Sequence, residues 1–84
     1  MLKNICDFCP PGTQIKSPGG VSFDPSQLVA VVATETYGEG LLELHTPGGV
    51  IKFEFYRNVG GGPADVYAIH RAIVEAGNAG KGEI

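Results

Sequence analysis

A Pro-Gly-Gly sequence occurs twice in this chain, and each copy leads directly into a β-prone run. Residues 17–20 precede Val-Ser-Phe at 21–23, and residues 46–49 precede Val-Ile-Lys-Phe at 50–53. Proline presets φ for the first corner of a turn, and glycine adopts the positive φ that a later position often requires. Two such turns predict antiparallel hairpins.

The second copy also predicts a strand register. If His45 pairs with Val50, then Glu43 lies opposite Lys52 as an opposite-charge cross-strand pair. Apolar and polar side chains then separate onto the two faces of the hairpin, whereas a one-residue slip mixes them. The predicted apolar face consists of Leu42, Leu44, Ile51, Phe53 and Phe55.

The first copy favours a different loop length, because pairing Ser17 with Val21 places Ile15 opposite Phe23. Turn residues and apolar alternation predict strands at 14–16, 21–23, 27–36, 41–46 and 50–56. These strands indicate an α+β fold. We expect a small antiparallel β-meander of about four to five strands with one C-terminal helix packed on one face.

The predicted helix covers residues 63–76. Pro63 suits the first helical position, with Gly62 as the cap and Asp65 in the first turn, where its negative charge favours the helix dipole. Gly77 is expected to end the helix. Spacings of three and four residues predict one buried stripe, formed by Val66, Ile69, Ile73 and Ala76.

The length of 84 residues suits a single domain. We divide it into an N-terminal arm at 1–13, antiparallel strands at 14–56, the helix at 63–76 and a flexible tail at 77–84. A chain this short buries only roughly 60–65% of the surface that its unfolded form exposes, so self-association would help to stabilise it.

The charge pattern argues against nucleic acid as a partner. The net charge is −3, and the six basic residues are scattered along the chain without forming a patch. We find no transmembrane run and no apolar core of a signal peptide near the start. The expected compartment is the cytoplasm, where Cys6 and Cys9 would stay reduced.

Residues 28–32 are apolar at five consecutive positions, whereas a strand covered on one face should alternate. This run predicts burial on both faces, either by a second copy of the chain or by the N-terminal arm folding over the outer face. A homo-oligomer is therefore one expectation. The candidate interface residues are Val29, Val31, Tyr67, His70, Arg71 and Val74.

A glycine run before the helix is the candidate ligand site. Backbone N–H groups at such a place can bind a phosphate or carboxylate, and a nearby arginine can add positive charge. The alternative is that the glycines only let the chain swing from sheet to helix. An acidic residue at the helix start would also repel an anion. The candidate ligand-binding residues are Arg57, Gly60, Gly61, Gly62 and Asp65.

Cys6 and Cys9 form a single C-x-x-C pair, which is half of a zinc signature. They are weak metal candidates unless two copies of the chain combine four thiols. His45 and His70 lack zinc-finger spacing and are expected at the surface. No recognisable spacing joins a nucleophile, a base and an orienting group, so we predict no catalytic residues, no cofactor and no enzymatic activity.

The Asp-Pro corner at 24–25 with the apolar run after it, followed by Leu-Glu-Leu at 42–44 and Ile-Lys-Phe at 51–53, resembles small bacterial and phage proteins, flagellar regulators among them. The resemblance implies a strand after the corner and a terminal helix, and it assigns no functional residue. We expect a non-enzymatic, homo-oligomeric binding module that binds or inhibits a partner protein, as phage-encoded inhibitors do. The alternative is sequestration of a phosphate-bearing ligand or nucleotide at the glycine-rich loop.

Overall fold

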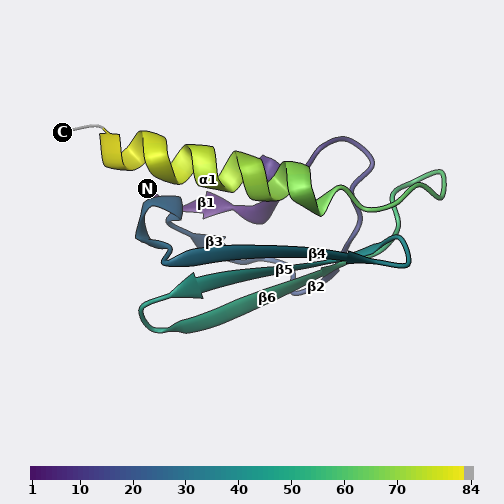
Figure 1. Ribbon diagram of the computed structural model, residues 1–84, viewed down its shortest axis with the longest axis horizontal. Coiled ribbons are helices and arrows are strands. Elements are labelled where there is room, and N and C mark those ends of the chain that lie inside the picture. The colour runs from purple at the N-terminus through teal and green to yellow at the C-terminus, as the bar shows by residue number, and fades with distance from the viewer. Residues whose placement is uncertain (83–84) are drawn as a thin grey trace.

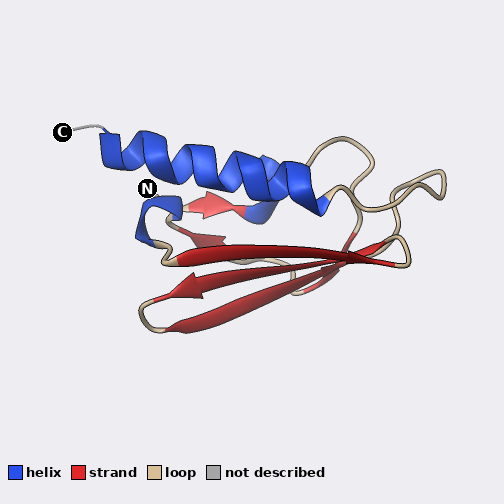
Figure 2. Cartoon of the chain, in the orientation of Figure 1, coloured by secondary structure: helices blue, strands red, loops and turns tan. Residues whose placement is uncertain are grey.

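In the computed structural model, one helix lies across an antiparallel sheet (Figure 1). The structure describes residues 1–82, and side chains as far as residue 79. The elements in chain order are β1 (Lys3–Asn4), η1 (Ile5–Phe8), β2 (Ile15–Ser17), β3 (Ser22–Phe23), η2 (Pro25–Gln27), β4 (Ala30–Thr36), β5 (Glu39–Thr46), β6 (Gly49–Phe55) and α1 (Val66–Gly82). The predicted α+β class is confirmed (Figure 2).

The main sheet has the strand order β2-β6-β5-β4, and β1 pairs with β3 in a separate small sheet. The register predicted for the second hairpin is confirmed. His45 pairs with Val50, and Glu43 lies opposite Lys52. At the tip of the hairpin, the hydroxyl of Thr46 accepts the N–H of Gly48 at 3.2 Å and donates to the carbonyl of Gly49 at 3.0 Å.

The hairpin between β4 and β5 has a two-residue turn, Tyr37-Gly38, flanked by the pair Thr36 and Glu39. Tyr37 has φ +53° and Gly38 has φ +82°, which are the positive values of a type I′ turn. This turn matches the right-handed twist of the strands it joins. The positive φ favours glycine at position 38, and a side chain there would also displace the guanidinium of Arg57.

The predicted first hairpin is wrong. β2 pairs with β6, where Ile15 lies opposite Phe55, and β3 pairs with β1. Phe23 is thereby buried, and its ring lies 5.8 Å from that of Phe8. The expected strand at 27–36 begins only at Ala30, because residues 25–27 form a 3₁₀ turn.

Residues 1–13 were expected to form an arm, but they contain β1 and η1. Asn4 caps η1 by accepting the N–H of Cys6, and Ile5 is 1% exposed in the core. This segment lies on the helix side of the sheet. It therefore does not cover the outer face, where Val32 and Val50 remain 43% and 48% exposed.

The helix was predicted at 63–76 but begins at Val66 and continues to Gly82. Asp65 precedes the helix and caps it, since its carboxylate accepts the N–H of Ala68 at 3.1 Å. Gly77 does not end the helix. A Cβ on Gly77 would lie 2.6 Å from the carbonyl oxygen of Pro25, so glycine there permits close packing of α1 on η2. The tail predicted at 77–84 is thus helical to residue 82, and residues 83–84 lie outside the described residues.

The core lies between α1 and the inner face of the sheet. The predicted stripe on α1 and the apolar face of the hairpin are buried here, with Ala76 and Ile51 only partly covered. The fully buried large side chains are Ile5, Leu42, Leu44, Phe53, Phe55, Val66, Ile69 and Ile73. Within residues 1–82, no helix combines the length and apolar character needed to cross a membrane.

Candidate functional site

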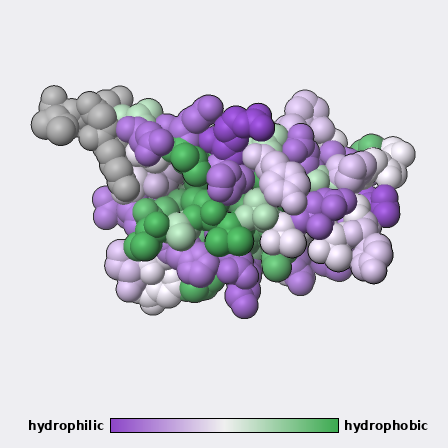
Figure 3. Space-filling model, in the orientation of Figure 1, coloured by the Kyte–Doolittle hydropathy of each residue, from purple (hydrophilic) through white to green (hydrophobic). Residues whose placement is uncertain are grey.

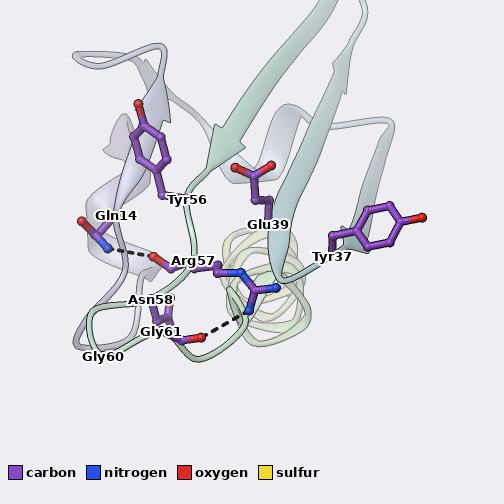
Figure 4. Close-up of a pocket in the computed structure, with 8 residues that line it drawn as sticks. All are labelled: Gln14, Tyr37, Glu39, Tyr56, Arg57, Asn58, Gly60 and Gly61. Atoms are coloured by element: carbon purple, nitrogen blue, oxygen red, sulfur yellow. Dashed lines mark hydrogen bonds between the residues drawn. The ribbon is translucent and has the colours of Figure 1, made fainter.

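Two surface regions bring together residues that were singled out in the sequence. The first is a pocket of about 560 Å³ beside the glycine-rich loop (Figure 4), which we call the Arg57 pocket. Its volume falls in the range of small-molecule sites. The lining residues are Gln14, Tyr37, Glu39, Tyr56, Arg57, Asn58, Gly60 and Gly61.

Arg57 is held in place by its own neighbourhood. Its guanidinium donates to the carbonyl of Gly61 at 3.3 Å, and its backbone carbonyl accepts the side-chain N–H of Gln14 at 2.7 Å. Figure 4 shows the guanidinium extending toward the Tyr37 turn and away from Gln14. Arg57 is therefore bonded to the glycine-rich loop, and its guanidinium lies against Gly38 in the turn between β4 and β5.

The glycine-rich loop is a turn closed by its own backbone. The N–H of Gly61 donates to the carbonyl of Asn58 at 2.9 Å, and the N–H of Asn58 donates to the carbonyl of Gly62 at 2.8 Å. Gly60 and Gly61 have φ of +93° and +87°. The Gly61 amide is thus used internally, which weakens the hypothesis of an anion cradle.

The structure brings only part of the predicted ligand set together. Arg57, Gly60 and Gly61 line the pocket, whereas Asp65 caps α1. Gly62 is not among the lining residues. The pairing of β2 with β6 and of β5 with β6 also brings Gln14 and Glu39 to this pocket. Neither residue is predicted from the sequence as part of the site.

The charges around the pocket are mixed. Glu39 pairs with Lys16 at 3.5 Å, and the Lys16 ammonium lies 5.1 Å from the centre of the Tyr56 ring. The carboxylate of Glu39 belongs to the same pocket as the guanidinium of Arg57. A phosphate placed there would therefore meet one group that attracts it and one that repels it.

The two cysteines differ in environment. Cys6 is exposed, whereas Cys9 is half-buried and its thiol donates to the carbonyl of Ile5 at 3.3 Å. Burial raises the pKa of Cys9 to about 11, and the neighbouring Cys6 adds to the rise. Cys9 is consequently a thiol at neutral pH. Across residues 1–82, no group of three or more His, Cys, Asp or Glu side chains is placed to hold a metal ion.

The second region is the free edge of β4 together with the side of α1 next to it, which we call the β4 edge surface. β4 pairs with β5 on one side, and it lies in front of the sheet in the view of Figure 1. In the same view, apolar side chains gather between α1 and the first part of β4 (Figure 3). Exposed side chains here include Val29 at 73%, Tyr67 at 54% and Val74 at 37%.

Two shallow grooves flank this edge, one at each end of β4. Val29, Val31 and Val74 line the first, with a volume of about 260 Å³. Glu35 and Tyr67 line the second, with a volume of about 360 Å³. Of the predicted interface residues, Val29, Val31, Tyr67 and Val74 therefore line grooves beside this edge.

The members of the predicted interface differ in exposure. Val29, Tyr67, Arg71 and Val74 are exposed and His70 is half-buried. Val31 is half-buried because it packs against the core.

Comparison of the chain with protein-family models, with curated proteins and with solved structures finds no match.

Proposed function

We propose that this protein is a non-enzymatic binding module that associates with itself and binds or inhibits a partner protein. The observation that supports this most strongly is the β4 edge surface. An edge strand presents a row of unpaired N–H and C=O groups on which another strand can be added. The neighbouring Val29, Val74 and Tyr67 offer apolar area for burial beside that row.

The two edges of the main sheet differ in how they resist such pairing. β2 has three residues, includes Lys16, and has an irregular register against β6. β4 has seven residues, has neither lysine nor proline, and carries one charge, Glu35. Natural sheets use short strands, charges and bulges to block unwanted pairing. By this criterion β2 is protected and β4 is left available for binding.

Site-specific photocross-linking in the cells that produce the protein tests the proposal. A benzoylphenylalanine at Val29 or Val74 probes the β4 edge surface, and the same group at the exposed Val50 serves as a matched control. We expect adducts at 29 and 74 and few at 50. An adduct of twice the chain mass of 8.8 kDa identifies a second copy, and any other mass identifies a different protein. Adducts at 50 alone, or at none of the three positions, would contradict the proposal.

A second candidate function is binding of a small phosphate-bearing ligand in the Arg57 pocket. The observation that favours it is that the guanidinium of Arg57 and the half-exposed side chain of Tyr56 line the same pocket, which has a suitable volume. A thermal-shift series with mononucleotides and inorganic phosphate tests it. Binding there predicts a stabilisation that Arg57→Ala removes and Arg71→Ala on the helix surface retains. No shift with any anion rules it out.

A further inference from the structure

The β4 edge surface is self-complementary, and from this we infer that the protein forms a two-fold symmetric dimer. In it, β4 of each copy pairs antiparallel about Val32, joining the two four-stranded sheets into one. The inference rests on the proposed function, because it assigns the partner at this surface to a second copy of the chain. Closed two-fold symmetry requires the same patch on both copies.

The turn after β4 determines which backbone groups face the open edge. Thr36 and Glu39 flank a two-residue loop, and such a flanking pair shares both of its hydrogen bonds. Hydrogen-bonded and non-hydrogen-bonded pairs then alternate along the ladder. The N–H and C=O groups of Val32 and Thr34 therefore point to β5. The N–H and C=O groups of Val31, Ala33 and Glu35 point away from β5, toward the open edge of the sheet.

Only a few registers let these outward groups bond to each other. A two-fold axis at Val32 joins Val31 to Ala33 of the second copy and places the two Val32 side chains opposite each other on the outer face. An axis at Ala33 instead places Val31 opposite Glu35 on the inner face. That register also places Val32 opposite Thr34, whereas the axis at Val32 has only apolar residues facing each other at the centre of the contact. The axis at Val32 is therefore favoured.

The same axis places each end of the β4 edge surface in one copy against the opposite end in the second copy. Val29 and Glu35 are each three residues from Val32. The groove at Val29 and Val74 in one copy thus meets the end that carries Glu35 and Tyr67 in the other. Tyr67 is 54% exposed and has an apolar ring with a polar tip. The ring fits the apolar groove of the second copy while its hydroxyl stays near solvent.

The dimensions suit an interface of ordinary size. The molecule measures 42 × 23 × 20 Å, and β4 and α1 run along the long axis in Figure 1. A stable interface covers about 800 Å² on each partner. The exposed surface of one copy is 4997 Å², so a contact of that size would cover about a sixth of it, which is most of one long side.

Sedimentation equilibrium of the purified chain provides the test. Wild type is expected at twice 8.8 kDa. Val32→Lys places two like charges opposite each other at the axis and should give the monomer mass. Val50→Lys changes the same residue type at similar exposure, 48% against 43%, on the same sheet face, and should remain dimeric. A wild type that stays monomeric at high concentration overturns the dimer, as does a dimer lost in the Val50 variant and kept in the Val32 variant.

A cysteine scan checks the register even if the lysine variant fails to fold. In a background with serine at Cys6 and Cys9, Val32→Cys should cross-link to its own copy on oxidation, and Ala33→Cys should not. Efficient cross-linking through Ala33 and none through Val32 overturns the register. If the purified chain is a monomer but photocross-links at Val29 to another protein, self-association fails and the proposed binding of a partner protein stands. If the purified chain is a monomer and no cross-link forms at Val29, both the dimer and the proposed binding function are refuted.

Discussion

The turn between β4 and β5 contains a strained residue whose replacement should stabilise the protein. Tyr37 has φ +53°, and the left-handed conformation costs a non-glycine residue about 1–2 kcal/mol. Asparagine adopts this conformation more readily and is favoured at this position of a type I′ turn. The Tyr37 side chain is 89% exposed, so its removal sacrifices little burial. We expect Tyr37→Asn to raise the free energy of unfolding by about 0.5–1 kcal/mol.

Urea unfolding in the Val32→Lys background measures this change without a contribution from subunit dissociation. For a small domain with a slope near 1 kcal/mol/M, the midpoint should rise by about 0.5–1 M at constant slope. Gly38→Ala is the opposing control, because its φ of +82° is strained for any residue with a side chain, and the added methyl would also displace the guanidinium of Arg57. A lower midpoint for Tyr37→Asn would refute the strain argument and show that the tyrosine ring stabilises the turn.

Three further predictions follow from local geometry. Gly77→Ala should destabilise the fold by about 1–2 kcal/mol in thermal unfolding, since the added methyl meets the backbone of η2, and a stabilised variant would contradict this packing. Iodoacetamide at pH 8 should alkylate Cys6 well before Cys9, whose pKa is raised to about 11, as peptide mass mapping would show; equal rates would count against its burial. Hydrogen bonds from a nearby serine hydroxyl and the N-terminal amine lower the pKa of Asp24 to about 2, so its stabilising contribution should be lost as the pH falls from about 4 to 2. Asp24→Asn should make the free energy of unfolding vary less with pH in that window. An unchanged pH dependence would refute the stabilising role of the Asp24 carboxylate.

The second hairpin could be predicted in detail because its information is local. Alternation and the pairing of Glu43 with Lys52 leave one register that separates the faces. The first Pro-Gly-Gly carries no such constraint. Its flanking strands have two or three residues, and each gains more by pairing elsewhere, Ile15 with Phe55 and Phe23 with Lys3. Contacts with distant parts of the fold determine the pairing partners of such short strands, and the local sequence does not reveal those contacts.

The ends of the helix were misplaced for a similar reason. Pro63 and Gly77 are typical of helix boundaries, but the helix begins after the Asp65 cap. It passes through Gly77 because close packing on Pro25 needs a residue without a side chain. A glycine required by tertiary contact looks the same in sequence as one required by a turn. The Arg57 pocket likewise depends on strand pairings that local sequence does not reveal.

The apolar run at 28–32 was the observation that led to the proposed oligomer, and the structure changes its meaning. We expected a strand covered on both faces, but β4 is an edge strand with Val32 43% exposed. The run now points to pairing along the edge instead of covering of a face. Residues 29–34 would then be buried by backbone pairing and by Tyr67 of the second copy.

Amide hydrogen exchange of β4 as a function of protein concentration tests this account most directly. The amides of Val32 and Thr34 point to β5 and should be protected at every concentration. Those of Val31 and Ala33 should exchange rapidly in dilute solution and become protected as the concentration rises through the dimerisation range. If the exchange of Val31 and Ala33 stays rapid at high concentration, β4 is not the site of self-association and the central claim is wrong.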